Sequence, residues 1–177
     1  MRKYTYTTAY FYLMRKNTDI VGQVYGNQLR VRVIGICEVN GKILMVKHRG
    51  LGSDGIFYMP PGGGMRFGES AIDCLKREFA EESGIMISVG QFICVTEYLE
   101  TPLHALELFF TVSRKGGVLK KGKDPEMGDK DQIIEKVEFM SYKRLNKIPY
   151  SQLHSLLHHV NSFSDIVHKQ GYSYISG

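Results

Sequence analysis

Hydrophobic and polar positions change their period several times along the chain, and each change predicts an element. Leu29 to Val39 is rich in β-branched residues, and a second apolar run, Lys42 to Lys47, follows directly after Asn40-Gly41. An Asn-Gly pair between two such runs is the strongest short-range signal of a β-hairpin. The pattern therefore predicts two antiparallel strands, then a short strand at Ile56 to Met59 that ends at two prolines.

One segment, Ser70 to Ser83, has the period of an amphipathic helix. At about 100° per residue, Ile72, Leu75 and Phe79 fall on one arc, which predicts an apolar stripe that packs on a sheet. Gly84 stands where a helix commonly ends in a left-handed residue. Further strands are predicted at Ile85–Thr96, Ala105–Ser113 and Gln132–Met140, and an amphipathic helix at Pro149–Val160.

Length and composition limit the class of protein. A chain of 177 residues with 43% hydrophobic residues fits one folded domain and excludes general disorder. No run approaches the ~20 apolar residues of a membrane-spanning helix, so no membrane partner is expected. The three cysteines lack the spacing of a disulfide framework or a zinc site, which favours a reducing cytoplasm.

Charge is unevenly distributed. The chain carries 23 basic and 18 acidic residues, a formal net charge of +5, which favours phosphate-bearing ligands. Within the predicted helix and its entry, however, acidic residues cluster at Glu69, Asp73, Glu78, Glu81 and Glu82. Like charges on neighbouring helical turns are destabilising unless something neutralises them, so the cluster predicts a bound cation.

The ligand types indicate which cation. Glu78, Glu81 and Glu82 lie on the arc beside the apolar stripe, and carboxylates of this kind suit Mg²⁺ or Mn²⁺. Gly62-Gly63-Gly64 precedes the helix, and a backbone without Cβ atoms can approach a metal ion or a phosphate closely. The alternative is a solvated helix face, the usual explanation of a run of charges.

The spacing of these residues matches a known motif. It reads Gly63, five residues, Glu69, seven residues, then Arg77-Glu78-Phe79-Ala80-Glu81-Glu82-Ser83-Gly84-Ile85. This resembles the signature box of the Nudix hydrolases at every defined position. The resemblance implies an α/β fold, an α/β/α sandwich with a mixed β-sheet in a single domain.

The resemblance also implies an activity. It is metal-dependent hydrolysis of a nucleoside diphosphate linked to another moiety, such as a nucleoside triphosphate, ADP-ribose or a nucleotide sugar. Two alternatives stay open: a non-catalytic nucleotide-binding or regulatory module, and another diphosphate chemistry on the same fold. Which nucleotide is the substrate is also open.

Roles in metal binding are implied by the same resemblance. Glu78, Glu81 and Glu82 are the expected ligands of Mg²⁺ or Mn²⁺, with the carbonyl of Gly62 as an extra ligand. Glu126 or Glu135 is expected to serve as a further ligand or base.

The expected catalytic residues are Glu81, Glu78 and Arg77. Glu81 is the candidate general base, and Arg77 would orient Glu78. Glu69 and Gly63 would give structural support, although Glu69 could instead simply stabilise the positive end of the helix dipole.

Candidate substrate-binding residues lie outside the box. Phe57, Tyr58, Tyr98 and His104 could line a pocket for the base on the sheet. His154 and His158, four residues apart, could in principle hold a metal, but packing of the predicted C-terminal helix is the simpler explanation. The lysines of the loop after residue 114 lack interleaved aromatic residues, so nucleic acid is not an expected partner.

The chain is expected to divide into three parts. Residues 1–28 form an N-terminal extension, residues 29–147 the Nudix hydrolase domain, and residues 148–177 a C-terminal helix and tail. Alternating tyrosines predict a strand from Tyr4 to Tyr12. It could pair within the fold or with a second subunit in a homodimer, and an unstructured leader is the alternative.

Overall fold

The computed structural model describes residues 22–52, 54–125 and 132–176. The strands are β1 (Leu29–Val39), β2 (Lys42–Arg49), β3 (Ile56–Met59), β4 (Gly62–Gly64), β5 (Ile85–Glu100), β6 (Leu103–Gly117), β7 (Ile134–Ser141) and β8 (Gly171–Ser176). The helices are α2 (Ala71–Ser83), α3 (Tyr142–Leu145) and α4 (Phe163–Val167), with 3-10 turns η1 (Tyr150–Gln152) and η2 (Ser155–Leu157). The predicted strand at Tyr4 to Tyr12 lies outside the described residues.

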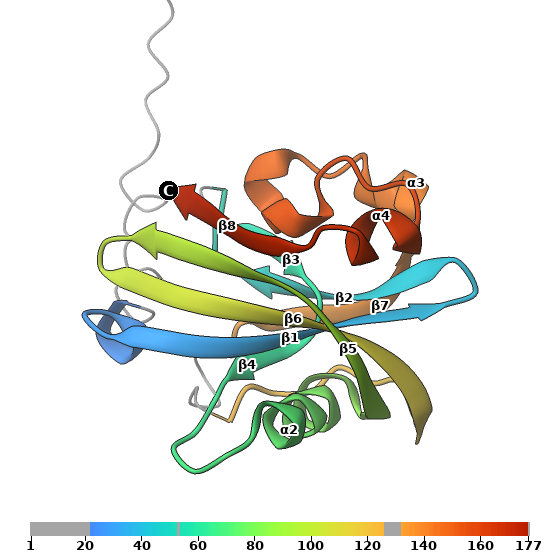
Figure 1. The fold of residues 1–177 in the computed structure, drawn as a ribbon, viewed down its shortest axis with the longest axis horizontal. Coiled ribbons are helices and arrows are strands. Elements are labelled where there is room, and N and C mark those ends of the chain that lie inside the picture. The colour runs from blue at the N-terminus through green and yellow to red at the C-terminus, as the bar shows by residue number, and fades with distance from the viewer. Residues whose placement is uncertain (1–21, 53, 126–131, 177) are drawn as a thin grey trace, which may run out of the picture.

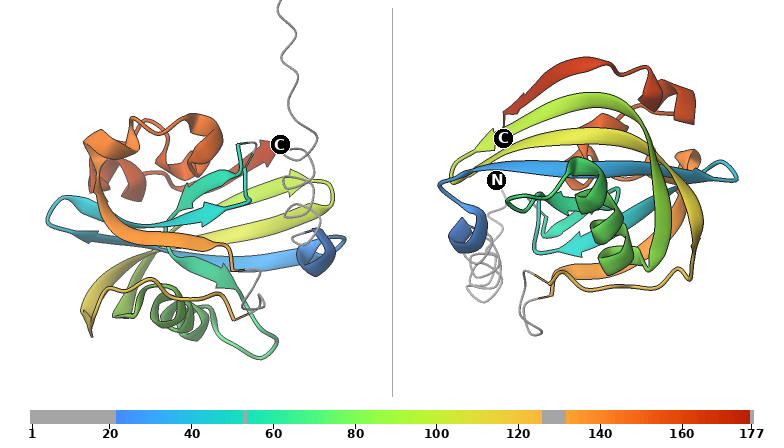
Figure 2. Two further views of the ribbon diagram at one scale, coloured as in Figure 1. Left: turned by 180° about the vertical axis from the view of Figure 1, so that it is seen from behind. Right: turned by 60° about the horizontal axis from the view of Figure 1, so that its bottom comes forward.

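The strands form one mixed, eight-stranded sheet in the order β3-β2-β1-β6-β5-β8, with β4 paired to β1 and β7 paired to β2. The β1–β6 and β5–β8 pairs are parallel, and the others are antiparallel. Helix α2 packs on one side of the sheet, and α3, α4 and the 3-10 turns cover the other (Figures 1 and 2). The predicted α/β sandwich with a mixed sheet is confirmed.

The hairpin between β1 and β2 follows from its turn residues. Asn40 and Gly41 have φ of 52° and 69°, the left-handed values that both central residues of a type I′ turn need. Because this turn matches the twist of the flanking strands, Glu38 pairs with Ile43 and Val39 with Lys42.

Helix α2 begins and ends at the residues expected from its sequence. The amide of Asp73 donates to Ser70 Oγ over 3.1 Å, which caps the first turn. Gly84, at φ 69°, ends the helix and donates its amide to Ala80 O. Leu75 and Phe79 are buried against the sheet as predicted.

The third residue of the predicted stripe, Ile72, is 49% exposed, so its predicted burial is wrong. Cys74 occupies the inner face of the first turn instead, where its thiol donates to Gly64 O. Because this short side chain reaches β4 directly, the first turn sits close to that strand and leaves Ile72 outside.

The predicted helix at Pro149–Val160 is also wrong, because the segment forms the two 3-10 turns. The backbone amide of His154 donates a hydrogen bond to the carbonyl of Tyr58 on β3, and Leu153 forms a parallel β-bridge with Tyr58. The imidazole of His154 accepts from the amide of Leu156, so side-chain and cross-strand bonds replace the helical ladder. The predicted apolar face is nonetheless buried, at Leu153, Leu156, Leu157 and Val160.

The chain after Val160 adds two elements that were not predicted. Helix α4 begins with a capping box in which Ser162 and Asp165 bond each other's backbone amides. Strand β8 then pairs in parallel with β5, from Cys94 beside Gly171 onward. No helix among the described residues has the length and apolar character needed to span a bilayer.

Candidate active site

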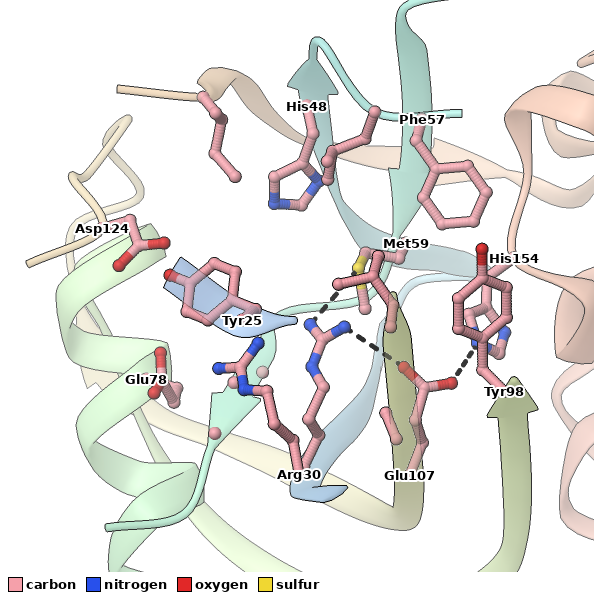
Figure 3. Close-up of a pocket in the computed structure, with 18 of the residues that line it drawn as sticks. Tyr25, Arg30, His48, Phe57, Met59, Glu78, Tyr98, Glu107, Asp124 and His154 are labelled. Atoms are coloured by element: carbon pink, nitrogen blue, oxygen red, sulfur yellow. Dashed lines mark hydrogen bonds and ion pairs between the residues drawn. The ribbon is translucent and has the colours of Figure 1, made fainter. Parts of the chain in front are cut away.

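A cavity of about 240 Å³ lies where α2 and β4 meet the ends of β1, β3 and β6. Figure 3 shows Glu78 and Asp124 on one side of it and Phe57, Tyr98 and His154 on the other. The cavity therefore has an acidic end beside α2 and an aromatic end beside β3 and β5.

Two buried carboxylates form the acidic end. Glu78 and Glu82 stand one helical turn apart and are 7% and 6% exposed. Glu82 Oε2 accepts the amide of Gly62 over 3.0 Å, and the carboxylate of Glu78 lies so close to Gly63 that a Cβ there would overlap it. The triple glycine thus lets β4 approach both carboxylates.

Burial makes these two carboxylates hard to ionise. Burial raises the pKa of Glu78, although Arg77 opposes the change. Burial and the charge of Glu78 together raise the pKa of Glu82 well above its usual range. A pair of this kind is stabilised by a cation bound between the two side chains.

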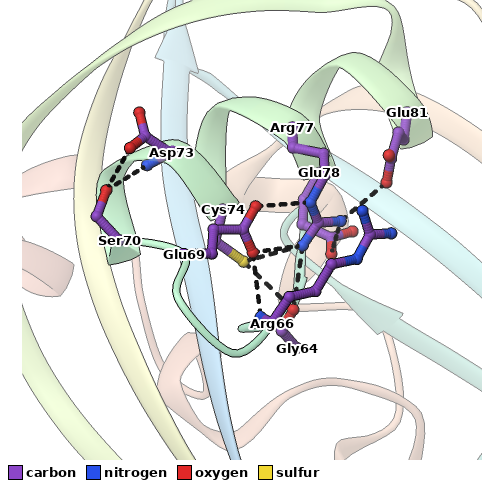
Figure 4. A network of polar contacts seen from close by, with 9 residues as sticks. All are labelled: Gly64, Arg66, Glu69, Ser70, Asp73, Cys74, Arg77, Glu78 and Glu81. Carbon is purple, nitrogen blue, oxygen red and sulfur yellow. Dashed lines mark hydrogen bonds and ion pairs between the residues drawn. The ribbon is translucent and has the colours of Figure 1, made fainter.

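Arg77 is the centre of a polar network at the base of the cavity (Figure 4). Its Nε and Nη2 donate to the two oxygens of Glu69 over 2.8 and 3.0 Å. Its Nη1 donates to Glu78 over 2.6 Å and to Glu81 over 3.0 Å. The hydrogen bonds from Arg77 lower the pKa of Glu69 to about 2, and the pKa of Arg77 is raised in turn. One guanidinium therefore orients three carboxylates.

Two of the three remaining acidic candidates lie away from the cavity wall. Glu81 contacts Arg77 and does not line the cavity, and Glu135 pairs with Lys47 over 2.6 Å. Glu126 is outside the described residues, whereas Asp124, two positions earlier, lines the acidic end. In the described part of the chain, no three His, Cys, Asp or Glu side chains form a metal-binding group.

The four candidate substrate-binding residues differ in whether they line the cavity. Phe57 and Tyr98 line the aromatic end, but Tyr58 does not, since successive residues of β3 face opposite sides. His104 borders the cavity, but its imidazole is engaged by Glu97 over 2.8 Å. Tyr98 donates its hydroxyl to Glu100, and burial together with that carboxylate raises the tyrosine's pKa.

Sequence reasoning missed a buried cluster around Glu107 on β6. Its carboxylate accepts from Arg32 Nη1 over 3.3 Å, from Thr96 Oγ1 over 3.0 Å and from His154 Nε2 over 2.7 Å. Because the amide of Leu156 donates to Nδ1 of His154, Nε2 is the ring nitrogen that donates to Glu107. Although burial alone would raise the pKa of Glu107, His154, Arg32 and Thr96 lower it to about 2.

Two arginines on β1 were also missed. Arg30 and Arg32 both line the cavity, and the Arg30 guanidinium stacks 3.7 Å from the centre of the Tyr25 ring. Their two-residue spacing on a predicted strand was a usable signal, because it places both side chains on one face.

His48 was missed as well. It lies on β2 at the cavity wall and is 5% exposed. Burial and the nearby charge of Arg32 lower its pKa to about 4. Its ring is therefore neutral near pH 7.

Comparisons with known proteins point to one family. A family model described as the NUDIX domain matches residues 26–158. A curated protein named ADP-ribose pyrophosphatase, from Methanocaldococcus jannaschii, is 29% identical over 122 residues, which are 68% of this chain. That match spans 66% of the relative's own length.

Solved structures share the fold at low sequence identity. A NUDIX hydrolase from Nitrosomonas europaea has a TM-score of 0.61 and 19% identity, over 73% of this chain and 84% of that one. An ADP-ribose pyrophosphatase from Streptococcus suis has a TM-score of 0.53 and 15% identity, over 82% and 98% of the two chains. The family model covers most of the chain, and Gly63, Arg77, Glu78 and Glu82 of the box line one cavity, so the chain belongs to the NUDIX domain family.

Proposed function

We propose that this hydrolase cleaves the diphosphate link between a nucleoside and a second group, and that ADP-ribose is among its substrates. The observation that carries the proposal is the burial of Glu78 and Glu82 together against the Gly62-Gly63 backbone, at one end of a cavity that is also lined by the two arginines of β1. The name of the relative from M. jannaschii supports the choice of ADP-ribose. The basic net charge of the chain suits a polyphosphate substrate.

We further propose that the acidic end binds Mg²⁺ or Mn²⁺. Mg²⁺ is usually held by one or two carboxylates, water and substrate phosphates, so Glu78 and Glu82 suffice as side-chain ligands. Both are hard oxygen donors, and burial raises the pKa of each. The carbonyl of Gly62 and the side chain of Glu81 remain the proposed additional ligands. When bound, the metal would supply an acidic water and neutralise charge on the phosphates.

The side chains of the network have supporting roles in this proposal. Arg77, fixed by its double hydrogen bond to Glu69, keeps Glu78 turned toward β4. The amide of Gly62 holds Glu82. Glu81 shares the Arg77 Nη1 donor with Glu78 and is the proposed general base.

The arginines of β1 are suited to the anionic substrate. The Arg30 side chain reaches Gly64: a Cβ added at Gly64 would lie 2.7 Å from Nη2 of Arg30. The guanidinium of Arg30 therefore lies beside β4. A diphosphate beside Glu78 and Glu82 would therefore meet a positive charge on β1, which offsets repulsion from the two carboxylates.

The test is hydrolysis of ADP-ribose with Mg²⁺, followed by chromatography of AMP and ribose 5-phosphate. We expect turnover with Mg²⁺, none in excess EDTA, and recovery when Mg²⁺ is restored. Full turnover in EDTA would refute the metal proposal. Nucleoside triphosphates, nucleotide sugars and dinucleoside polyphosphates are tested in the same way. If the protein binds these compounds but hydrolyses none of them, it is a non-catalytic module.

A further inference from the structure

Two buried side-chain nitrogens have no hydrogen-bond partner within the part of the chain that the structure describes. They are Nδ1 of His48 and Nε of Arg32, and both residues line the cavity. A buried polar atom without a partner is unfavourable, and native structures rarely retain one without a reason. Two such atoms in the wall of one cavity indicate that a bound ligand completes their hydrogen bonds.

The two nitrogens offer complementary chemistry. Figure 3 shows the His48 ring directed into the cavity. With its proton on Nε2, the neutral His48 ring presents Nδ1 as an acceptor. Nε of Arg32 is always a donor. A ligand must therefore bring one N–H or O–H and one acceptor to this wall.

Arg32 is held in place by its other nitrogens. Nη1 donates to Glu107, and Nη2 contacts the sulfur of Met59 over 3.8 Å. Glu107 is itself fixed by Thr96 and His154. The direction of the Arg32 Nε–H bond is thus set before any ligand binds.

Apolar and aromatic side chains also line this cavity. Phe57, Leu51 and Ile133 line the same cavity as His48 and Arg32. A ligand group that fits must have apolar faces and a polar edge, which describes a nucleobase. A sugar carries hydroxyls in several directions and would leave some of them against these apolar side chains.

We infer that His48 and Arg32 bind the hydrogen-bonding edge of the substrate's nucleobase. Nδ1 of His48 accepts an N–H of the base, and Nε of Arg32 donates to a neighbouring ring nitrogen or carbonyl oxygen. The inference rests on the proposed function, because it assigns the base of the nucleotide whose diphosphate lies at Glu78 and Glu82.

The first test measures binding and needs no turnover. The Nδ1 resonance of His48 is followed by NMR in ¹⁵N-labelled protein during titration with four nucleoside monophosphates and with ribose 5-phosphate. We expect at least one nucleotide to shift this resonance, and ribose 5-phosphate to leave it unchanged. An equal shift with ribose 5-phosphate would mean that the sugar is bound there, and no shift with any nucleotide would equally overturn the inference.

The second test compares two substrates in variants of His48. The substrates are ADP-ribose and the diphosphate of two ribose 5-phosphate units, which lacks a base. The preference for ADP-ribose is the ratio of its kcat/KM to that of the base-free diphosphate. His48→Leu should reduce this ratio at least about tenfold. His48→Gln, whose amide oxygen can accept a hydrogen bond, should keep part of the preference. Lys47→Met, the neighbouring residue on β2 that contacts Glu135, is the matched control and should keep the wild-type ratio.

Stability gives a readout independent of activity. Because His48→Leu removes an unpaired buried nitrogen, it should unfold at a higher urea concentration than the wild type without ligand. An unchanged substrate ratio in His48→Leu, or a wild-type ratio near one, would overturn the inference while hydrolysis itself continued. Loss of hydrolysis in the wild type would instead refute the proposed function.

Discussion

At the scale of single residues, two buried glutamates differ because their partners differ. Glu82 and Glu107 are 6% and 4% exposed, yet the pKa of Glu82 is raised and that of Glu107 is lowered to about 2. Glu107 contacts Arg32, Thr96 and His154, whereas the hydrogen bond that Glu82 accepts comes from a backbone amide. Glu107 is therefore a neutralised structural group, and Glu82 is a group suited to an added cation.

The first prediction concerns Glu82→Gln, which keeps the side-chain volume but removes one charge. The kcat for ADP-ribose should fall by at least about a hundredfold, because one proposed metal ligand is lost. The metal-free protein should be at least as stable as the wild type in urea, since repulsion from Glu78 is relieved. Wild-type turnover in a folded Glu82→Gln protein would remove Glu82 from the site.

The second prediction concerns acid stability and Glu107. Its pKa is lower in the folded protein than in the unfolded chain, so its contribution is complete above pH 4.5 and is lost as the pH falls toward 2. A shift of this size corresponds to about 3 kcal/mol. Glu107→Gln should lose roughly that free energy of unfolding at pH 7 and show a flatter dependence on pH. Urea unfolding between pH 7 and pH 3 measures both, and parallel wild-type and variant profiles would contradict the assignment.

At the scale of elements, local chemistry was enough to predict the hairpin and α2. Asn40-Gly41 specifies its own turn, and Ser70 and Gly84 specify the helix ends, so each signal lies within the element it defines. The carboxylates of α2 could be predicted for the same reason. Their spacing on a helix is visible in the sequence.

Other features depend on contacts between distant residues. The Pro149–Val160 segment has a helical pattern, but its bond to Tyr58 on β3 decides its conformation. Glu107 and His154 are 47 residues apart in the sequence, and Arg32 and Glu107 are 75 apart. They meet because β1 and β6 pair in parallel with Arg32 beside Glu107, a register that no local pattern encodes.

The third prediction tests β4 with Gly63→Ala. The added Cβ would overlap the end of the Glu78 side chain, which can move, so the fold should survive at a cost below about 1 kcal/mol. The displaced carboxylate should reduce kcat at least about tenfold. Gly116→Ala on β6 is a matched control, because its Cβ would lie 2.8 Å from the flexible end of Met86, away from the cavity. Equal activity of both variants would show that activity does not require the Glu78 carboxylate to lie against Gly63.

At the scale of the whole molecule, the cavity is assembled from both halves of the chain. Tyr25 precedes the residues that the family model matches, whereas His154 lies close to their end. The sheet joins these distant segments, so the site depends on the complete fold more than on the box alone.

The fourth prediction uses two deletions to test what the N-terminal residues contribute. Removal of residues 1–21 leaves every described cavity residue in place, so hydrolysis should persist. Removal of residues 1–25 also deletes Tyr25, which stacks on Arg30, and should raise KM. Light scattering on the shorter deletion tests the proposed intersubunit strand, which requires a fall in mass from dimer to monomer. An unchanged mass would reject that strand.

The most direct test of the central claim is the site of bond cleavage. Hydrolysis of ADP-ribose in ¹⁸O-labelled water, with mass spectrometry of both products, shows which atom the water attacks. Because the carboxylates and the glycine backbone of β4 would hold the diphosphate, attack should fall on phosphorus, and one ¹⁸O should appear in a phosphate of AMP or ribose 5-phosphate. Label found only on a sugar hydroxyl would mean carbon–oxygen cleavage and would contradict the account.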